Sequence, residues 1–216
     1  MITKYGYFTV GTVAVIFFIC IASSFFINNV YFKYTLAGVS FLLLVFTLNF
    51  FRDPDRTPPE GENKLVSPAD GTVIVIKEVQ PDEFIKENCT QISIFMSPLN
   101  VHVNRIPISG KVDYLKYFEG EYLFANHDKA DKRNERSVIG ITSDYGKILF
   151  TQVAGFVARR IIYDLKVGQV VQIGKRFGMI KFGSRVDVIV PRDWDIKVKE
   201  GDKVTAGETI LFEYNK

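Results

Sequence analysis

Cysteine and histidine are scarce in this chain of 216 residues, which contains two of each. Cys20 lies inside an apolar run and Cys89 lies far from it, so no disulfide framework is expected and a reducing, intracellular setting is favoured. With two separated histidines, no cysteine pair and no His-Glu-x-x-His helix, the sequence has no zinc-binding pattern. We therefore expect no metal cofactor.

The sequence also lacks a strong excess of positively or negatively charged residues. The formal net charge is only +3, and the lysines and arginines are not interleaved with aromatic residues as in RNA-binding segments. The sequence has no glycine-rich phosphate cradle either. These absences exclude nucleic acid as an expected partner, whereas the mild basicity is compatible with an anionic membrane surface.

Charged residues are missing from two long stretches near the N-terminus. Residues 7–27 and 34–51 carry none, and each approaches the ~20 residues that a helix needs to cross a bilayer. Since only residues 28–33 separate them, we expect a transmembrane helical hairpin over residues 1–51. A cleaved signal peptide is the alternative for the first stretch. One lysine precedes that stretch, no convincing small-residue cleavage site follows it, and a second apolar stretch comes at once.

The basic residues around these stretches predict an orientation. Lys4 precedes the first stretch, and Arg52, Arg56 and Lys64 follow the second, whereas Lys33 is the one basic residue between them. Because basic residues concentrate on the cytoplasmic side of membrane proteins, we expect both ends of the hairpin there. The domain that follows would then lie at the cytoplasmic face of the cell membrane.

The remainder of the chain has the periodicity of strands. Residues 52–64 contain three prolines and are expected to form an extended linker. Over residues 65–216, short alternating or apolar runs are separated by glycine turns, and Val186, Val188 and Val190 fall on one face of a half-buried strand. This pattern predicts a mainly β fold, in which a compact β barrel or sandwich forms the catalytic domain behind the hairpin.

One dipeptide in the β pattern is a candidate for chemistry. Gly183 and Ser184 lie between two strand patterns, where a serine hydroxyl beside a glycine carbonyl can act as a nucleophile. Most such steps are ordinary turns or bulges, and the second glycine of a nucleophile elbow is missing here. His102 and Asp70 are candidates for proton transfer, with a structural strand histidine and a turn aspartate as alternatives. By themselves these residues indicate a membrane-anchored β domain with a candidate nucleophilic serine.

Four motifs occur in a specific order, although each is weak by itself. They are residues 51–56 (Phe-Arg-Asp-Pro-Asp-Arg), 67–71 (Ser-Pro-Ala-Asp-Gly), 96–107 (Met-Ser-Pro-Leu-Asn-Val-His-Val-Asn-Arg-Ile-Pro) and 182–184 (Phe-Gly-Ser). Together they resemble the phosphatidylserine decarboxylase family, in the short form that it shares with archaetidylserine decarboxylases. The resemblance covers residues 51–190, and the hydrophobic hairpin in front is also typical of the family.

The resemblance implies a proenzyme that cuts itself. Ser184 Oγ would attack the Gly183 carbonyl to give an ester, and elimination would then release the chain of residues 1–183. The dehydroalanine left at position 184 would hydrolyse to a pyruvoyl group, a covalent cofactor at the start of the chain of residues 184–216. The two chains would form a heterodimer, and further oligomerisation is left open.

The resemblance also implies the reaction. The pyruvoyl group derived from Ser184 would form a Schiff base with the amine of an aminophospholipid in the membrane and act as an electron sink while carbon dioxide leaves. The product would carry an ethanolamine headgroup. The motifs do not separate ester-linked phosphatidylserine from ether-linked archaetidylserine.

The motif positions imply roles for three further residues. His102 and Asp70 fall where the family has a base and its orienting carboxylate, in the manner of a triad, and His102 would return the proton after decarboxylation. Longer members carry a second histidine where this chain has Arg105. The base for self-cleavage is therefore open: His102 serves both steps, or Asp70 acts with another group. Arg105 either pairs with the substrate carboxylate or phosphate, or is a structural arginine.

Two other classes of protein match parts of the sequence. The glycine-rich C-terminal repeats resemble a membrane-anchored biotinyl or lipoyl carrier or adaptor, but Met179-Ile180-Lys181 does not match the lysine of such modules. A membrane-tethered serine hydrolase would use Ser184 without cutting the chain. Neither class accounts for residues 67–71 and 100–107 together, so we favour the decarboxylase.

Overall fold

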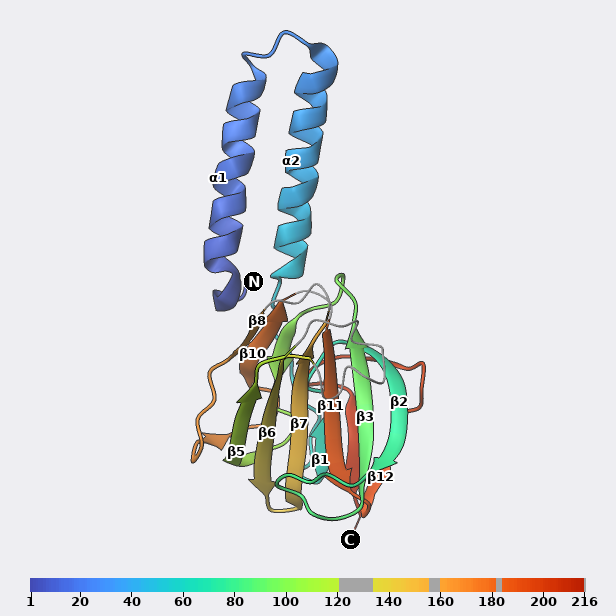
Figure 1. Ribbon diagram of the computed structural model, residues 1–216. Coiled ribbons are helices and arrows are strands. Elements are labelled where there is room, and N and C mark those ends of the chain that lie inside the picture. Colours follow the sequence, from blue (N-terminus) through green and yellow to red (C-terminus); the bar gives the residue numbers. More distant parts are fainter. Residues whose placement is uncertain (121–133, 156–159, 182–183, 216) are drawn as a thin grey trace. The chain divides into compact units, whose positions relative to one another are not determined.

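A computed structural model describes residues 1–120, 134–155, 160–181 and 184–215 of the chain. The chain divides into two compact units, Met1–Asp55 and Arg56–Lys216. The first unit is helical and the second is built from strands (Figure 1). The chain is therefore mainly β with two apolar helices before the β unit, which confirms the predicted fold class.

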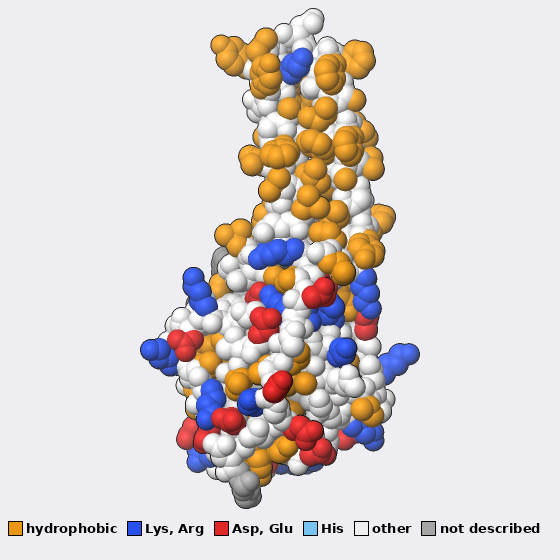
Figure 2. Space-filling model, turned by 180° about the vertical axis from the view of Figure 1, so that it is seen from behind, with side chains coloured by type: hydrophobic (Ala, Val, Ile, Leu, Met, Phe, Trp, Pro, Cys, Tyr) orange, Lys and Arg blue, Asp and Glu red, His pale blue; other side chains and the backbone are white. Residues whose placement is uncertain are grey.

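The first unit is a pair of apolar helices. A 3-10 turn, η1 (Lys4–Gly6), leads into α1 (Tyr7–Ser24), and α2 (Val30–Phe50) follows. Both helices are long and apolar enough to cross a membrane. Hydrophobic side chains are exposed along both of them (Figure 2). A helix that exposes apolar side chains all round is suited to an apolar surrounding, which indicates association with a membrane.

The boundaries predicted for these helices are wrong by several residues at the turn. α1 ends at Ser24 instead of residue 27, and α2 begins at Val30 instead of residue 34. α2 begins at Val30 because of a side-chain cap: Asn29 Oδ1 accepts a hydrogen bond from the Phe32 amide at 3.1 Å. Lys33, expected in the turn, consequently lies in the first turn of α2.

Backbone hydrogen bonds join the two ends of the hairpin. The Thr3 amide donates to the Phe51 carbonyl at 2.9 Å, and the Asp53 amide donates to the Met1 carbonyl at 2.7 Å. Ile2 and Arg52 form an antiparallel bridge between these contacts. The start of the chain is therefore fastened to the segment that follows α2.

The β unit contains one large sheet of eight antiparallel strands, which curls in Figure 1. Its strands in spatial order are β13 (Lys203–Val204), β2 (Gly71–Val79), β3 (Cys89–Met96), β11 (Ser184–Pro191), β7 (Gly146–Ala154), β6 (Arg136–Ser143), β5 (Gly110–Phe118) and β9 (Val170–Val171). The central position of β11, between β3 and β7, determines the surroundings of Ser184.

Two smaller sheets complete the β unit, each with three strands. The first contains β1 (Lys64–Val66), β14 (Ile210–Tyr214) and β12 (Trp194–Ile196), and the second contains β4 (Val103–Arg105), β10 (Arg176–Lys181) and β8 (Arg160–Tyr163). β1 begins within the stretch predicted as linker. β4 covers three residues of the motif at residues 96–107.

An apolar core connects the sheets. Val186 and Val188 of β11 are fully buried in it, together with Phe150 of β7. The Phe150 ring meets Phe177 of β10 edge to face, with ring centroids 5.4 Å apart, and Phe212 of β14 belongs to the same cluster. The predicted inward face of β11 is thus confirmed.

The prediction that β11 is only half-buried is wrong, because its other face is covered as well. On that face the side chains of Arg185 and Asp187 are 5% and 8% exposed. They form a two-pronged ion pair, with Nε to Oδ1 at 2.8 Å and Nη2 to Oδ2 at 2.9 Å. A buried charge requires such a partner, so the pair allows a central strand to carry charged residues.

Candidate active site

Ser184 is the first residue of β11 and lies inside the large sheet. It is opposite Met96 of β3 on one side and Ala154 of β7 on the other. The residue is fully buried, and its Oγ donates to Met96 Sδ at 3.3 Å. Alternation along the strand places its side chain on the core face with Val186. Gly183, the other residue of the predicted cleavage site, lies outside the described residues.

Asn104 of β4 reaches across the start of β11. Its Nδ2 lies 3.9 Å from Met96 Sδ, and its Oδ1 accepts a hydrogen bond from Gln152 Nε2 at 2.8 Å. Met96 belongs to β3 and Gln152 to β7, the two strands that flank β11. The Asn104 amide therefore lies over the first residues of β11, close to Ser184. Sequence analysis missed Asn104, although its spacing of two residues from His102 places both on one face.

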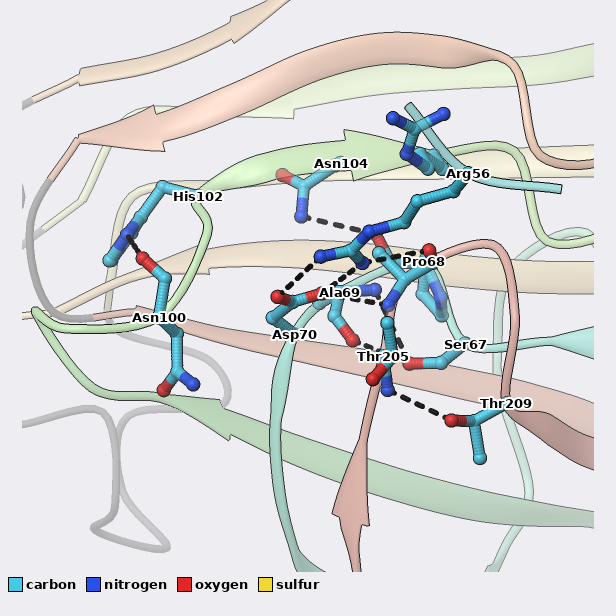
Figure 3. A network of polar contacts seen from close by, with 12 residues as sticks. Arg56, Ser67, Pro68, Ala69, Asp70, Asn100, His102, Asn104, Thr205 and Thr209 are labelled. Atoms are coloured by element: carbon cyan, nitrogen blue, oxygen red, sulfur yellow. Dashed lines mark hydrogen bonds and ion pairs between the residues drawn. The ribbon is translucent and has the colours of Figure 1, made fainter. Parts of the chain in front are cut away.

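His102 directly precedes β4 and is fully buried. Its Nδ1 lies 2.9 Å from the Asn100 carbonyl oxygen (Figure 3). Because a carbonyl oxygen only accepts hydrogen bonds, Nδ1 carries a proton in this contact, which leaves Nε2 as the nitrogen that can take up a proton. A histidine held in this tautomer is suited to act as a base.

A tight turn fixes the carbonyl that holds His102. The Ser97 amide donates to Asn100 Oδ1 at 2.8 Å, and the Asn100 amide donates back to the Ser97 carbonyl at 2.9 Å. These reciprocal bonds orient the backbone of Asn100 before the chain reaches the histidine. The tautomer of His102 is thus set by local structure.

Asp70 lies in a loop that contacts β4 but is bonded to an arginine. Both carboxylate oxygens meet the Arg56 guanidinium, with Nη2 to Oδ2 at 2.8 Å, and Oδ1 also accepts from the Ala206 amide at 2.8 Å (Figure 3). In the part of the chain that the structure describes, these are the partners of Asp70, and His102 is not among them. The role of Asp70 in orienting the histidine therefore stays a prediction.

The motif loop of Asp70 and the histidine motif nevertheless meet at Pro68. The Pro68 carbonyl accepts from the Arg105 amide at 2.9 Å and from Asn104 Nδ2 at 3.3 Å. Pro68 and Asn104 are 36 positions apart in the chain, so these contacts hold two of the sequence motifs together at β4. The contact brings Asp70 near the site without joining it to His102.

The side chain of Arg105 lies on the face of β4 opposite His102 and Asn104, by the alternation of a strand. It is 4% exposed, and its Nη1 donates to the Gly174 carbonyl at 2.9 Å. A Cβ atom at Gly207 would lie 2.9 Å from Arg105 Cδ, so the arginine packs closely on that turn. These contacts fit the structural alternative for Arg105, and its contact with the substrate stays a prediction.

Comparison with known proteins places the chain in a family. The family model described as phosphatidylserine decarboxylase matches residues 43–212, which is most of the chain. The chain belongs to the phosphatidylserine decarboxylase family. The resemblance inferred from the four motifs is therefore confirmed.

Individual relatives support this over nearly the whole length. A phosphatidylserine decarboxylase proenzyme of Chlorobium limicola is 45% identical over 214 residues, which cover 99% of this chain and 100% of the relative. Proteins of the same name from Chlorobaculum tepidum and Chlorobium phaeovibrioides are each 52% identical, over 82% and 79% of this chain and 81% and 77% of their own lengths. The similarity thus includes the hairpin as well as the β unit.

In this member of the phosphatidylserine decarboxylase family, two further residues hold the strand beside Ser184. Asn134 Nδ2 donates to the Ala154 carbonyl at 2.7 Å, and the Glu135 carbonyl accepts from the Ala154 amide at 2.9 Å. Glu135 Oε1 also accepts from Tyr117 Oη at 2.6 Å. Asn134 and Glu135 are both buried, and these hydrogen bonds to β5 and β7 satisfy their polar groups.

The carrier alternative finds little support in this family member. A carrier lysine stands at the tip of a hairpin, but Lys181 ends β10, and the next strand, β11, belongs to a different sheet. Within the described ranges, no group of three or more histidine, cysteine, aspartate or glutamate side chains could hold a metal ion. The described side chains of Ser184, His102 and Asn104 supply a hydroxyl, an imidazole and a carboxamide.

Proposed function

We propose that this chain is a proenzyme that cuts itself between Gly183 and Ser184 and then removes the carboxylate from the serine headgroup of a phosphatidylserine-type lipid. The observation that carries the proposal is the placement of Ser184, fully buried at the start of β11, on the same face of the core as Asn104. His102 lies two residues before Asn104, in the tautomer of a base. The word proenzyme in the names of the relatives supports a self-cleaving chain.

Self-cleavage begins with Ser184. Its Oγ adds to the carbonyl carbon of residue 183 while the hydroxyl proton passes to His102 Nε2. The C–N bond then breaks, the nitrogen of residue 184 takes up a proton, and an ester joins the two residues. We assign the base to His102 because Arg56 and the Ala206 amide already occupy the Asp70 carboxylate.

Elimination completes the cut. A base removes the Cα proton of residue 184, the Cβ–Oγ bond breaks, and the chain of residues 1–183 leaves with a terminal carboxylate. The dehydroalanine that remains reacts with water, loses ammonia and becomes a pyruvoyl group. These reaction steps make the cofactor from the chain itself, and water is the only other reactant.

The residues around Ser184 fit such a group. The neighbouring side chains of Met96, Asn104 and Gln152 carry neither a charge nor an amine that would react with a ketone. When present, the pyruvoyl group supplies a carbonyl that condenses with the substrate amine and draws electrons from the bond to the departing carboxylate. His102 would then deliver a proton to the carbon that lost the carboxylate.

The sheet topology supports a lasting complex of the two products of the cut. The chain of residues 184–216 would begin with β11, which pairs with β3 and β7 in the middle of the large sheet. It would also contribute β14, which pairs with β1 of the longer chain. Both pairings bury core residues, so we expect a stable heterodimer after cleavage.

The hairpin supports a lipid as the substrate. α1 and α2 are apolar enough to hold the enzyme in a bilayer, so the lipid need not leave the membrane to react. The basic residues Lys4, Arg52 and Arg56 at the ends of the hairpin favour the cytoplasmic side for the β unit. The proposed reaction therefore takes place at the inner face of the cell membrane.

Intact mass spectrometry of the detergent-extracted chain tests the cut, and release of carbon dioxide from phosphatidylserine tests the reaction. We expect two chains split at Gly183–Ser184, the shorter with a pyruvoyl N-terminus, and we expect Ser184→Ala to stay whole and inactive. Ser143→Ala is the matched control, because Ser143 is the last residue of β6 and its hydroxyl makes an exposed hydrogen bond to the Gly146 carbonyl. Decarboxylation by Ser184→Ala would overturn the mechanism. Parallel assays with ester-linked and ether-linked serine lipids identify the substrate.

A further inference from the structure

Three buried polar residues form a chain of hydrogen bonds that ends beside Ser184. Ser137 Oγ donates to Gln152 Oε1 at 2.7 Å, and Gln152 Nε2 donates to Asn104 Oδ1 at 2.8 Å. Ser137, Gln152 and Asn104 are all fully buried. The chain runs from β6 through β7 to β4 and therefore connects the large sheet to one of the smaller ones.

The order of donors and acceptors fixes how each amide points. Because the Ser137 hydroxyl donates to the oxygen of Gln152, the NH2 group of Gln152 faces Asn104. Because that NH2 group donates to the oxygen of Asn104, the NH2 group of Asn104 faces Met96 and the start of β11. Reversing either amide would place two donors or two acceptors against each other in a buried site, which is costly.

The NH2 group of Asn104 has only weak contacts in the uncut chain. It lies 3.3 Å from the Pro68 carbonyl oxygen and 3.9 Å from Met96 Sδ. The first distance is longer than a typical N–H···O bond, and a thioether sulfur is a weak acceptor. Ser184 Oγ approaches the same sulfur at 3.3 Å. The donor and the serine oxygen thus share Met96 Sδ as a neighbour, and the donor has capacity for a stronger acceptor.

We propose that Asn104 donates a hydrogen bond to the Oγ atom of residue 184 as that atom leaves during elimination, and that Ser137 and Gln152 position Asn104 for this role. The inference rests on the proposed function. In the step concerned, a base takes the Cα proton, the Cβ–Cα double bond forms, and the electron pair of the Cβ–Oγ bond goes to Oγ. That oxygen becomes part of the carboxylate of residue 183 and gains negative charge.

A fixed donor acts most strongly on the state in which charge develops. In the uncut chain Oγ is a neutral hydroxyl, for which the Met96 contact is sufficient. As the Cβ–Oγ bond breaks, the charge on Oγ strengthens any hydrogen bond to it, and a buried site amplifies the effect. The contribution is therefore larger in the transition state than in the ground state, which is the requirement for acceleration.

The test uses the full-length chain and follows cutting by mass spectrometry, with hydroxylamine added to samples at intervals. Hydroxylamine cleaves the ester intermediate, leaving a hydroxamate on residue 183 and an intact serine at position 184. Asn104→Asp keeps the oxygen that accepts from Gln152 but removes the donor. We expect cutting to slow by about 10- to 100-fold, the effect of losing one hydrogen bond to a charged atom. We also expect the hydroxylamine-sensitive chain to accumulate.

A second pair of variants separates positioning from folding. Ser137→Ala leaves Asn104 in place but removes the donor that orients Gln152, so cutting should slow by several-fold with the same intermediate. Ser137→Thr keeps the hydroxyl and should restore the rate. If Asn104→Asp does not fold, as judged by thermal unfolding in a Ser184→Ala background, the Ser137 pair decides the question.

The outcomes of this test are distinct from those of the proposed function. An unmodified chain that never cuts, even with no substitution, refutes the proposed function and this inference together. A chain that cuts normally, with Asn104→Asp cutting at the same rate, overturns this inference alone. Slower cutting without a hydroxylamine-sensitive chain also overturns it, since the loss would then precede the ester. Equal rates for Ser137→Ala and Ser137→Thr would remove Ser137 from the positioning role.

Discussion

Arg56 and Asp70 form a two-pronged ion pair in which the side chains are only 7% and 13% exposed. Arg56 Nη1 also donates to the Ala206 carbonyl at 2.9 Å, and the Ala206 amide donates back to Asp70 Oδ1 at 2.8 Å. The first residue of the β unit is thereby joined to the loop of residues 67–71 and to the turn that contains Ala206. One arginine thus holds three segments that are distant in the sequence.

Removing Arg56 should destabilise the protein strongly. Arg56→Ala leaves the nearly buried Asp70 carboxylate without its cation, and we expect the free energy of unfolding to fall by about 3 kcal/mol. Arg56→Lys should recover only part of this, because an ammonium group cannot make both contacts. Thermal unfolding of the full chain in detergent measures the effect, and Asp70→Asn completes a double-mutant cycle. A coupling free energy near zero would show that the ion pair is not a stabilising contact.

His102 and Asp70 should differ in their effects on self-cleavage. His102→Ala removes the proposed base and should leave the chain whole over hours. Asp70→Asn keeps an oxygen that can accept from the Ala206 amide, so it should slow cutting much less. The fraction of cut chain against time, read from denaturing gels, compares the two. Equal loss of cutting in both variants would favour Asp70 as the base or its essential partner.

Arg105 should matter for stability and not for lipid binding. Arg105→Met keeps much of the side-chain volume but loses the hydrogen bond to the Gly174 carbonyl. We expect the free energy of unfolding to fall by about 1–3 kcal/mol, with an unchanged KM for the lipid in the variant that cuts. The measurement is a pair of thermal unfolding and decarboxylation assays. A large rise in KM with unchanged stability would restore the substrate-binding role.

The thiol of Cys89 should be unreactive in the folded protein. Burial, and then the nearby carboxylates of Glu87 and Asp193, raise its pKa from 9.0 to about 11. At pH 8 the thiolate fraction is therefore about 100-fold lower than in the unfolded chain, and alkylation by iodoacetamide should slow at least in proportion. A Cys20→Ser background leaves Cys89 as the only thiol. Labelling at equal rates before and after unfolding would contradict the prediction.

Much of the fold follows from local sequence patterns. The absence of charge in two stretches predicted the helices, and the alternation of Val186 with Val188 predicted the core face of β11. The prediction failed where a single side chain decided a boundary, as Asn29 does by capping α2.

The site was only partly predictable. The motif residues Ser184 and His102 are both buried in the structure. Asn104 of β4, whose side chain contacts both strands that flank β11, was missed because an asparagine has no distinctive pattern in a strand. The expected association of Asp70 with His102 was drawn from motif positions. The structure instead places Arg56 at the Asp70 carboxylate, and an ion pair between residues 14 positions apart leaves no periodic signal.

The sequence by itself determined the apolar hairpin, the β character of the remaining chain and the order of the motifs, since each depends on residues that are neighbours along the chain. Only the tertiary structure decided which side chains meet. Ser184 lies against Met96, 88 residues away, and Arg56 lies against Ala206, 150 residues away. Contacts of this kind arise from strand pairing and from packing of one sheet on another, and no local pattern encodes them.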